Sequence, residues 1–124
     1  IDHVGQRACK EKEIMICNAA GYSNETVSEL AVGMAINVLR KINDGDKAAR
    51  EGKTLASAGL MGTELGTKTV GIIGTGRIGV MTAKLFKAFG CRVLGYNRTK
   101  KDDAVQAGIE YVELEELLKN TLMN

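Results

Sequence analysis

Three glycines, Gly74, Gly76 and Gly79, stand in the spacing G-x-G-x-x-G. The short apolar run before them, residues 70–73, suits a strand that is buried on both faces. The segment after them carries apolar residues at helical spacing, and Gly90 is placed to end that helix. Residues 91–96 then predict a second strand. In this order of strand, glycine turn, helix and strand, the glycine spacing indicates a dinucleotide-binding turn.

Each glycine has a distinct role in that turn. Gly74 permits the tight turn, Gly76 lets the backbone approach a pyrophosphate without an intervening Cβ, and Gly79 lets the helix lie close to the strand. The free N–H groups and the positive dipole end of the helix then hold phosphate oxygens, and Arg77 adds a cationic contact. The alternative is a turn in which the glycines serve only packing, and the flanking strands argue against it.

The end of the second predicted strand carries Asn97, about 20 residues after the turn, where an NAD-binding fold places an acidic residue on the adenosine ribose. Asparagine still bonds a hydroxyl group, but it brings no charge to repel a 2′-phosphate. Arg98, which comes next, is suited to clamp such a phosphate. We therefore predict NAD(P)H as cofactor, with NADP slightly favoured over NAD. A solvated basic turn at residues 98–101 is the alternative.

Composition sets broad limits on the class of protein. The chain has 124 residues and a formal net charge of +2, which suits one domain and gives no reason to invoke nucleic acid or an anionic membrane. Cys9, Cys17 and Cys91 cannot all pair and show no C-x-x-C spacing, so they predict free thiols in a reducing cytoplasm. We expect no signal peptide, no membrane span and no metal site.

The first part of the chain offers little chemistry. His3 is the only histidine, and without a partner carboxylate fixed beside it, it is a poor candidate for a catalytic acid or base. No catalytic residue is therefore predicted. Residues 13–17, with the sequence EIMIC, predict a short strand.

A long helix is predicted next, with Asn24 as its N-cap and apolar residues recurring at helical spacing between Val27 and Ile42. Because this helix is apolar on nearly all sides, it is predicted to lie in a core or between two chains. Gly33 and Ala35 would allow close approach to another helix. Residues 43–46 are predicted to stop it, residues 47–51 allow one more helical turn or two, and residues 52–66 are predicted to form a surface connection.

The C-terminal part continues the alternation of strands and helices. Residues 102–107 predict a short helix, residues 109–112 a third strand and residues 113–119 another helix. This pattern argues for an α/β fold with right-handed crossovers and a parallel sheet in the order 3-2-1. The predicted class is a partial Rossmann-type doubly wound sheet, its first βαβαβ half, preceded by a long interface helix.

Three stretches together carry a specific resemblance: NAAGYSNETVSELAVGMAINVLRKI, GTELGTKTVGIIGTGRIG and KAFGCRVLGYNR. They resemble the D-isomer-specific 2-hydroxyacid dehydrogenase family over nearly the whole chain, most clearly at residues 18–98. The resemblance implies a Rossmann cofactor domain inserted into a flavodoxin-like substrate domain. It also implies homodimers joined through the helix from Val27 to Ile42. Residues 1–23 would then be a remnant of the substrate-domain crossover, and residues 24–124 a dinucleotide-binding domain whose second half is absent.

The resemblance also implies the activity. The parent protein would reduce a small 2-oxo acid to a D-2-hydroxy acid, or carry out the reverse, by hydride transfer. No residue here matches the family's catalytic arginine, glutamate and histidine, so we expect this chain to be inactive alone. We also expect it to self-associate, because the sheet of a partial domain has an open edge. The alternative is a non-catalytic dinucleotide-binding or sensing module of the same fold. The candidate cofactor-binding residues are Gly74, Thr75, Gly76, Arg77, Ile78, Gly79, Asn97, Arg98 and Thr99.

Overall fold

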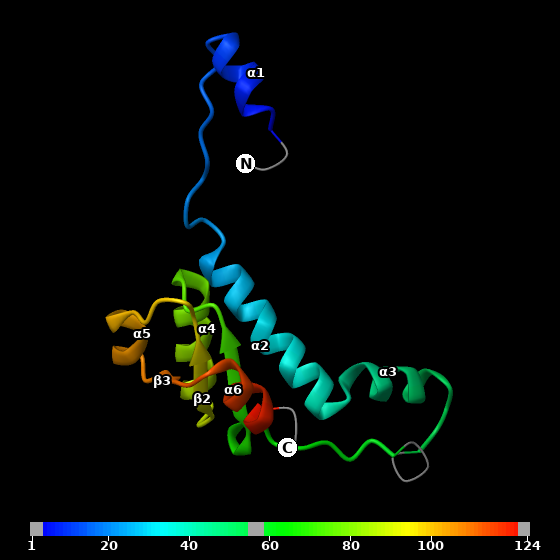
Figure 1. The fold of residues 1–124 in the computed structure, drawn as a ribbon. Helices are drawn as coiled ribbons and strands as arrows, with labels where there is room; N and C mark the ends of the chain where they lie inside the picture. Colours follow the sequence, from blue (N-terminus) through cyan, green and yellow to red (C-terminus); the bar gives the residue numbers. More distant parts are fainter. Residues whose placement is uncertain (1–3, 55–58, 122–124) are drawn as a thin grey trace.

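The structure is a computed structural model that describes residues 4–54 and 59–121. Three parallel strands, β1 (Thr69–Ile73), β2 (Arg92–Tyr96) and β3 (Glu110–Tyr111), form one sheet in the order β1-β2-β3 (Figure 1). The helices α4 (Arg77–Ala88), α5 (Asp102–Gln106) and α6 (Leu114–Thr121) follow the strands in turn. The α/β class and the strand order 3-2-1 are confirmed.

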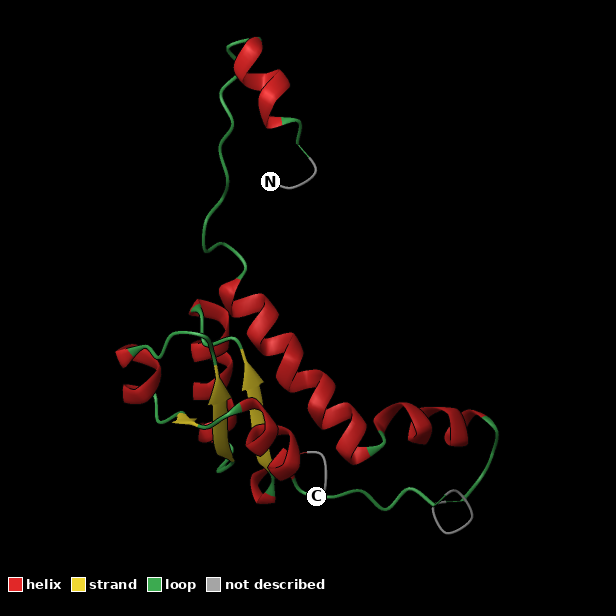
Figure 2. Cartoon of the chain, viewed as in Figure 1, coloured by secondary structure: helices red, strands yellow, loops and turns green. Residues whose placement is uncertain are grey.

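Helices cover both faces of the sheet (Figure 2). Successive residues of β1 show the two layers, because a Cβ on Gly71 would meet Leu117 of α6 whereas Ile72 packs against Gly79 at the start of α4. The long helix α2 (Asn24–Arg40) lies against α4. The core is formed by buried residues of the sheet, α2, α4, α5 and the segments that flank the strands: Val32, Leu65, Ile72, Val80, Ala83, Phe86, Cys91, Val93, Ala104 and Ile109.

The start of the chain differs from the prediction. The short helix α1 (Gln6–Glu11) has no buried residue and stands away from the rest of the domain (Figure 1). Residues 13–17 form no strand, so that prediction was wrong. A strand needs a neighbour for its backbone hydrogen bonds, and no described strand lies beside this segment. Its apolar side chains at Ile14 and Met15 are exposed.

The long helix begins and ends slightly differently from the prediction. The N-cap position belongs to Ser23, and Asn24 is the first helical residue. Lys41 adopts a left-handed conformation, with φ 53° and ψ 40°, which turns the chain into α3 (Ile42–Arg50). Residues 43–46 therefore lie inside a helix and do not end one. The side chain of Asn37 supports the change of direction by accepting the backbone N–H of Asn43 at 3.1 Å.

Two further contacts hold the sheet and its connections. Arg92 and Glu110 form an ion pair between β2 and β3 with an Nη2–Oε2 distance of 2.6 Å, and the hydrogen bonds from Arg92 lower the pKa of the Glu110 carboxyl. Cys91 is buried, its thiol donates to the carbonyl of Leu65 at 3.2 Å, and burial raises the pKa of that thiol. Leu65 lies in the 3₁₀ turn η1 (Leu65–Thr67) that leads into β1.

None of the helices in residues 4–54 and 59–121 is long and apolar enough to cross a membrane. His3 lies outside the described residues, as do residues 55–58 of the predicted surface connection.

Candidate functional site

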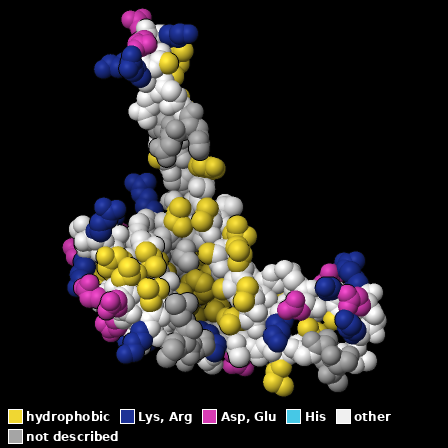
Figure 3. Space-filling view, turned by 45° about the vertical axis from the view of Figure 1, so that its right-hand side comes forward, with side chains coloured by type: hydrophobic (Ala, Val, Ile, Leu, Met, Phe, Trp, Pro, Cys, Tyr) yellow, Lys and Arg dark blue, Asp and Glu magenta, His cyan; other side chains and the backbone are white. Residues whose placement is uncertain are grey.

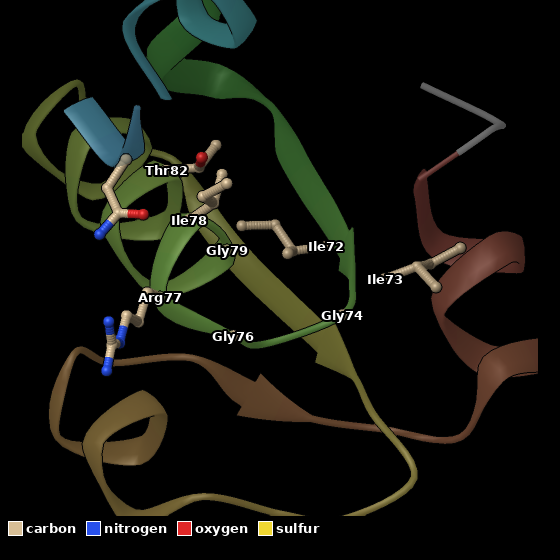
Figure 4. Close-up of a pocket in the computed structure, with 9 residues that line it drawn as sticks. Ile72, Ile73, Gly74, Gly76, Arg77, Ile78, Gly79 and Thr82 are labelled. Atoms are coloured by element: carbon tan, nitrogen blue, oxygen red, sulfur yellow. The ribbon is translucent and has the colours of Figure 1, made fainter. Parts of the chain in front are cut away.

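An open cavity of about 580 Å³ lies at the carboxyl end of β1 (Figure 4). In open parallel sheets this edge is where ligands bind. The cavity is lined by the end of β1, the turn after it, the start of α4 and one residue of α2: Asn24, Ile72, Ile73, Gly74, Gly76, Arg77, Ile78, Gly79 and Thr82. The predicted glycine turn therefore forms one wall of this cavity.

The three glycines of the turn have separable structural reasons. Gly74 has φ +96°, in the left-handed region that side chains rarely adopt. A Cβ on Gly79 would overlap the carbonyl oxygen of Gly74, so glycine is needed there for close packing of helix and strand. Gly76 has an extended backbone, with φ −77° and ψ −169°, and apart from its two chain neighbours no atom of the described residues lies within 4 Å of where its Cβ would be. Packing among the described residues therefore does not require glycine at position 76. The close approach of a ligand to the backbone would require it.

The start of α4 is positively polarised. The backbone N–H groups of a first helical turn have no partner within the helix, and the dipole places partial positive charge there. The first turn of α4 contains no acidic residue, and Arg77 is its first residue. Among the residues that the structure describes, the guanidinium of Arg77 forms no ion pair. Figure 4 shows the Arg77 side chain extending outward from the start of α4. This arrangement suits an anionic ligand such as a pyrophosphate.

Thr75 and Ile78 face different surroundings. Thr75 is fully buried, and its hydroxyl is hydrogen-bonded to the hydroxyl of Tyr111, so its side chain is not available to a ligand in the turn. Ile78 lines the cavity, and its carbonyl accepts a hydrogen bond from Ser28 at 3.3 Å. Because Ser28 is itself completely buried, this bond docks α2 onto the first turn of α4.

The second predicted loop follows β2. The side chain of Asn97 donates to the carbonyl of Thr99 at 2.8 Å, which closes a tight turn around Arg98. Arg98 is exposed and, within the described part of the chain, has no carboxylate partner. The loop lies beside the glycine turn, since the N–H of Gly74 donates to the carbonyl of Tyr96 at 2.8 Å. The structure thus brings the two predicted loops together at one edge of the sheet.

Asn24 and Tyr111 belong to this region but were not predicted to be functional. Asn24 was assigned only as a helix cap, yet it lines the cavity, and its side chain and that of Arg77 both lie beside Gly21. Tyr111 ends β3 and reaches the glycine turn from 36 positions away in the sequence. The predicted strand order could have indicated Tyr111 as a residue of this site, because the order 3-2-1 places the end of the third strand near both loops. In residues 4–54 and 59–121, no cluster of three histidine, cysteine or acidic residues could hold a metal.

Residues 32–123 match the family described as D-isomer specific 2-hydroxyacid dehydrogenase, NAD binding domain. This chain belongs to that family. The match covers β1, β2, β3 and the two candidate loops, so the α/β fold and the assignment to an NAD-binding domain rest on sequence and structure together.

Individual dehydrogenases of the family agree with this assignment. A D-lactate dehydrogenase from Streptococcus agalactiae is 42% identical over 97 residues, which is 78% of this chain and 29% of that protein. The apo-structure of D-lactate dehydrogenase from Escherichia coli superimposes with a TM-score of 0.87 at 32% identity, over 98% of this chain and 38% of that one. The D-lactate dehydrogenase from Aquifex aeolicus complexed with NAD and lactic acid gives 0.83 at 32% identity, over 98% and 36%. The chain spans about a third of the length of the curated relatives it matches.

Proposed function

We propose that this chain is the cofactor-binding part of an NAD(P)-dependent oxidoreductase that interconverts a small 2-oxo acid and a D-2-hydroxy acid. The observation that carries the proposal is Gly76, for which packing among the described residues gives no reason to be glycine, and which lies beside Arg77 at the start of α4. The family membership and the names of the relatives support the reaction class.

The residues of this chain would divide the work of binding as follows. The backbone of the turn from Gly74 to Gly79 would hold the pyrophosphate, and Arg77 would neutralise part of its charge. Asn97, Arg98 and Thr99 would hold the adenosine ribose. The nicotinamide, when bound, supplies or accepts a hydride. The three free cysteines fit a reducing compartment, and we place the protein in the cytoplasm.

Titration of the purified chain with NADH and NADPH, at one ionic strength, tests the proposal. We expect saturable binding of both dinucleotides, and no reduction of pyruvate or glyoxylate by this chain alone. Absence of binding to either dinucleotide would contradict the assignment of these loops to a cofactor. Turnover by the isolated chain would contradict the expectation that it lacks catalytic groups.

We further propose a slight preference for NADPH, because Asn97 carries no charge and Arg98 is free to reach a 2′-phosphate. Replacing Arg98→Ala is expected to weaken NADPH binding about tenfold, or ~1.4 kcal/mol, and NADH binding by less than about twofold. The loss should shrink at high salt, since an exposed arginine–phosphate contact is screened. Isothermal titration calorimetry at low and high salt provides the measurement.

The matched control for that experiment is Arg50→Ala, which removes an exposed arginine that pairs with Asp46 in α3. It should leave both affinities unchanged. Equal weakening of NADH and NADPH by Arg98→Ala would show that this arginine does not read the 2′-phosphate, and residues 98–101 would then be a solvated basic turn.

An apolar face on α2 supports a second proposal, that the chain forms a homodimer through this helix. Leu30, Met34 and Val38 follow one another at intervals of four residues, so they lie on one side of the helix, and they are 62%, 60% and 75% exposed. Figure 3 shows hydrophobic side chains gathered on the face to which α2 contributes. Outside the backbone of α2 and the two neighbouring residues, no described atom lies within 4 Å of a Cβ built on Gly33, which leaves room for a second helix.

Replacing Val38→Glu is expected to convert the dimer to monomer at the same protein concentration, because a charge would then have to be buried in an apolar interface. Light scattering coupled to size exclusion measures the mass. The control is Val105→Glu, an exposed valine on α5, which should leave the dimer intact. A monomeric wild-type chain, or a dimer that survives Val38→Glu, would rule out this interface.

A further inference from the structure

The hydroxyl of Tyr111 joins the two loops of the candidate site. It is hydrogen-bonded to the hydroxyl of Thr75 in the glycine turn, and it accepts the backbone N–H of Lys101, which closes the loop after β2, at 3.2 Å. The ammonium of Lys100 lies 6.0 Å from the centroid of the same ring, a cation–π distance. One side chain from β3 therefore contacts both loops.

The local packing places Tyr111 and Thr75 together. In the parallel ladder Tyr111 is the register partner of Gly95 in β2. A Cβ on Gly95 would overlap Ile109 and crowd the methyl group of Thr75, so glycine at this position of β2 makes room for both side chains. Thr75 is fully buried, and the tyrosine is the hydrogen-bond partner of its hydroxyl. Loss of the tyrosine hydroxyl would leave a buried polar group unsatisfied, which proteins avoid.

We propose that Tyr111 is a positioning residue that holds the glycine turn and the loop at residues 97–101 at the separation required by one dinucleotide. This inference rests on the proposed function, which assigns the pyrophosphate to the turn and the adenosine ribose to the loop. A ligand that engages both loops at once depends on their relative position and gains affinity when that position is fixed beforehand. The affinity of a ligand that engages only one loop does not depend on the relative position of the two loops.

The test replaces Tyr111→Phe, which keeps the ring and removes the hydroxyl. The dissociation constant for NADH is expected to rise about five- to tenfold, as for loss of one or two hydrogen bonds. The dissociation constants for adenosine and for inorganic pyrophosphate, each followed by NMR titration, should change by less than about twofold. Unequal effects on the whole dinucleotide and on its parts distinguish positioning from a general loss of structure.

Two further variants isolate the hydrogen bond. Thr75→Val removes its other end at nearly constant volume, and the double variant should bind NADH no more weakly than Tyr111→Phe alone. Thr121→Val is the control, because among the described residues the hydroxyl of Thr121 donates within α6, to the carbonyl of Leu117 at 2.7 Å. It should leave the affinity for NADH unchanged. Additive losses in the double variant would overturn the proposal, as would wild-type affinity in Tyr111→Phe.

Amide hydrogen exchange of the ligand-free chain tests the connection without any cofactor. In Tyr111→Phe the N–H of Lys101 and the N–H groups of residues 74–77 should exchange faster, while those of α6 should not. Unchanged exchange in both loops would overturn the proposal. If the wild-type chain binds neither dinucleotide, the proposed function fails, and the exchange rates still decide whether Tyr111 connects the loops.

Discussion

Gly76→Ala is expected to lower the affinity for NADH at least tenfold, ~1.4 kcal/mol or more, while the free energy of unfolding changes by less than about 1 kcal/mol. The reason is that the new methyl group meets no atom of the described residues within 4 Å other than those of its chain neighbours, whereas in the proposed function it would obstruct the approach of the pyrophosphate. Thermal unfolding and an NADH titration on the same protein measure the two effects separately.

Gly76→Ala is expected to change the affinity for NADH much more than the free energy of unfolding. An affinity equal to that of the wild type would show that no ligand approaches the backbone at Gly76. A fall in stability that parallels the fall in binding would show instead that glycine serves the fold at this position, against the open space around it in the structure.

Gly79→Ala is expected to have the largest effect on stability, lowering the free energy of unfolding by about 3 kcal/mol. Its Cβ would overlap the carbonyl oxygen of Gly74, and that segment cannot easily withdraw because the N–H of Gly74 is bonded to Tyr96 at 2.8 Å. Relief of the overlap would have to separate α4 from β1. Urea unfolding followed by circular dichroism measures the change.

The control for this second variant is Gly45→Ala, another glycine-to-alanine change inside a helix. Gly45 lies in α3, and the nearest atom to its Cβ would be 3.9 Å away, an ordinary contact. This change should stabilise the chain by up to about 1 kcal/mol, because alanine is the better helix former. If Gly79→Ala were as stable as Gly45→Ala, the close approach of α4 to β1 would not be the reason for glycine at that position.

The sequence predicted the central part of the fold well because its signals are local. The strand β1, the glycine turn, the helix α4 and the strand β2 are consecutive, and Gly90, with φ +91°, ends α4 as its position suggested. The parallel order also followed from local information, since regular alternation of strands and helices is typical of a parallel sheet joined by crossovers.

Features that depend on distant partners were not predictable in the same way. Residues 13–17 have the composition of a strand, but a strand forms only beside a neighbour, and no described strand is next to them. The turn at Lys41 depends on a left-handed backbone in a residue type that rarely adopts one. The contact between Tyr111 and Thr75 joins positions that only the sheet brings together.

In the candidate site, too, features set by local sequence were predictable and features set by distant residues were not. The spacing of the glycines predicted where the turn would lie, and the structure places the turn on a cavity beside the loop that holds Asn97 and Arg98. The spacing could not predict that the side chain of Thr75 turns inward, because that direction is set by burial against Gly95 and Tyr111. Nor could it predict that Ser28 would dock α2 onto α4.

The most direct test of the central claim, that a dinucleotide lies across both loops, is a ¹H–¹⁵N spectrum of the uniformly labelled chain recorded during addition of NADH. We predict that addition of NADH causes the largest shifts at the N–H groups of residues 74–79 and 97–101, with little change in α3 and α6. Shifts that fall elsewhere, or a spectrum that does not change at saturating NADH, would contradict it.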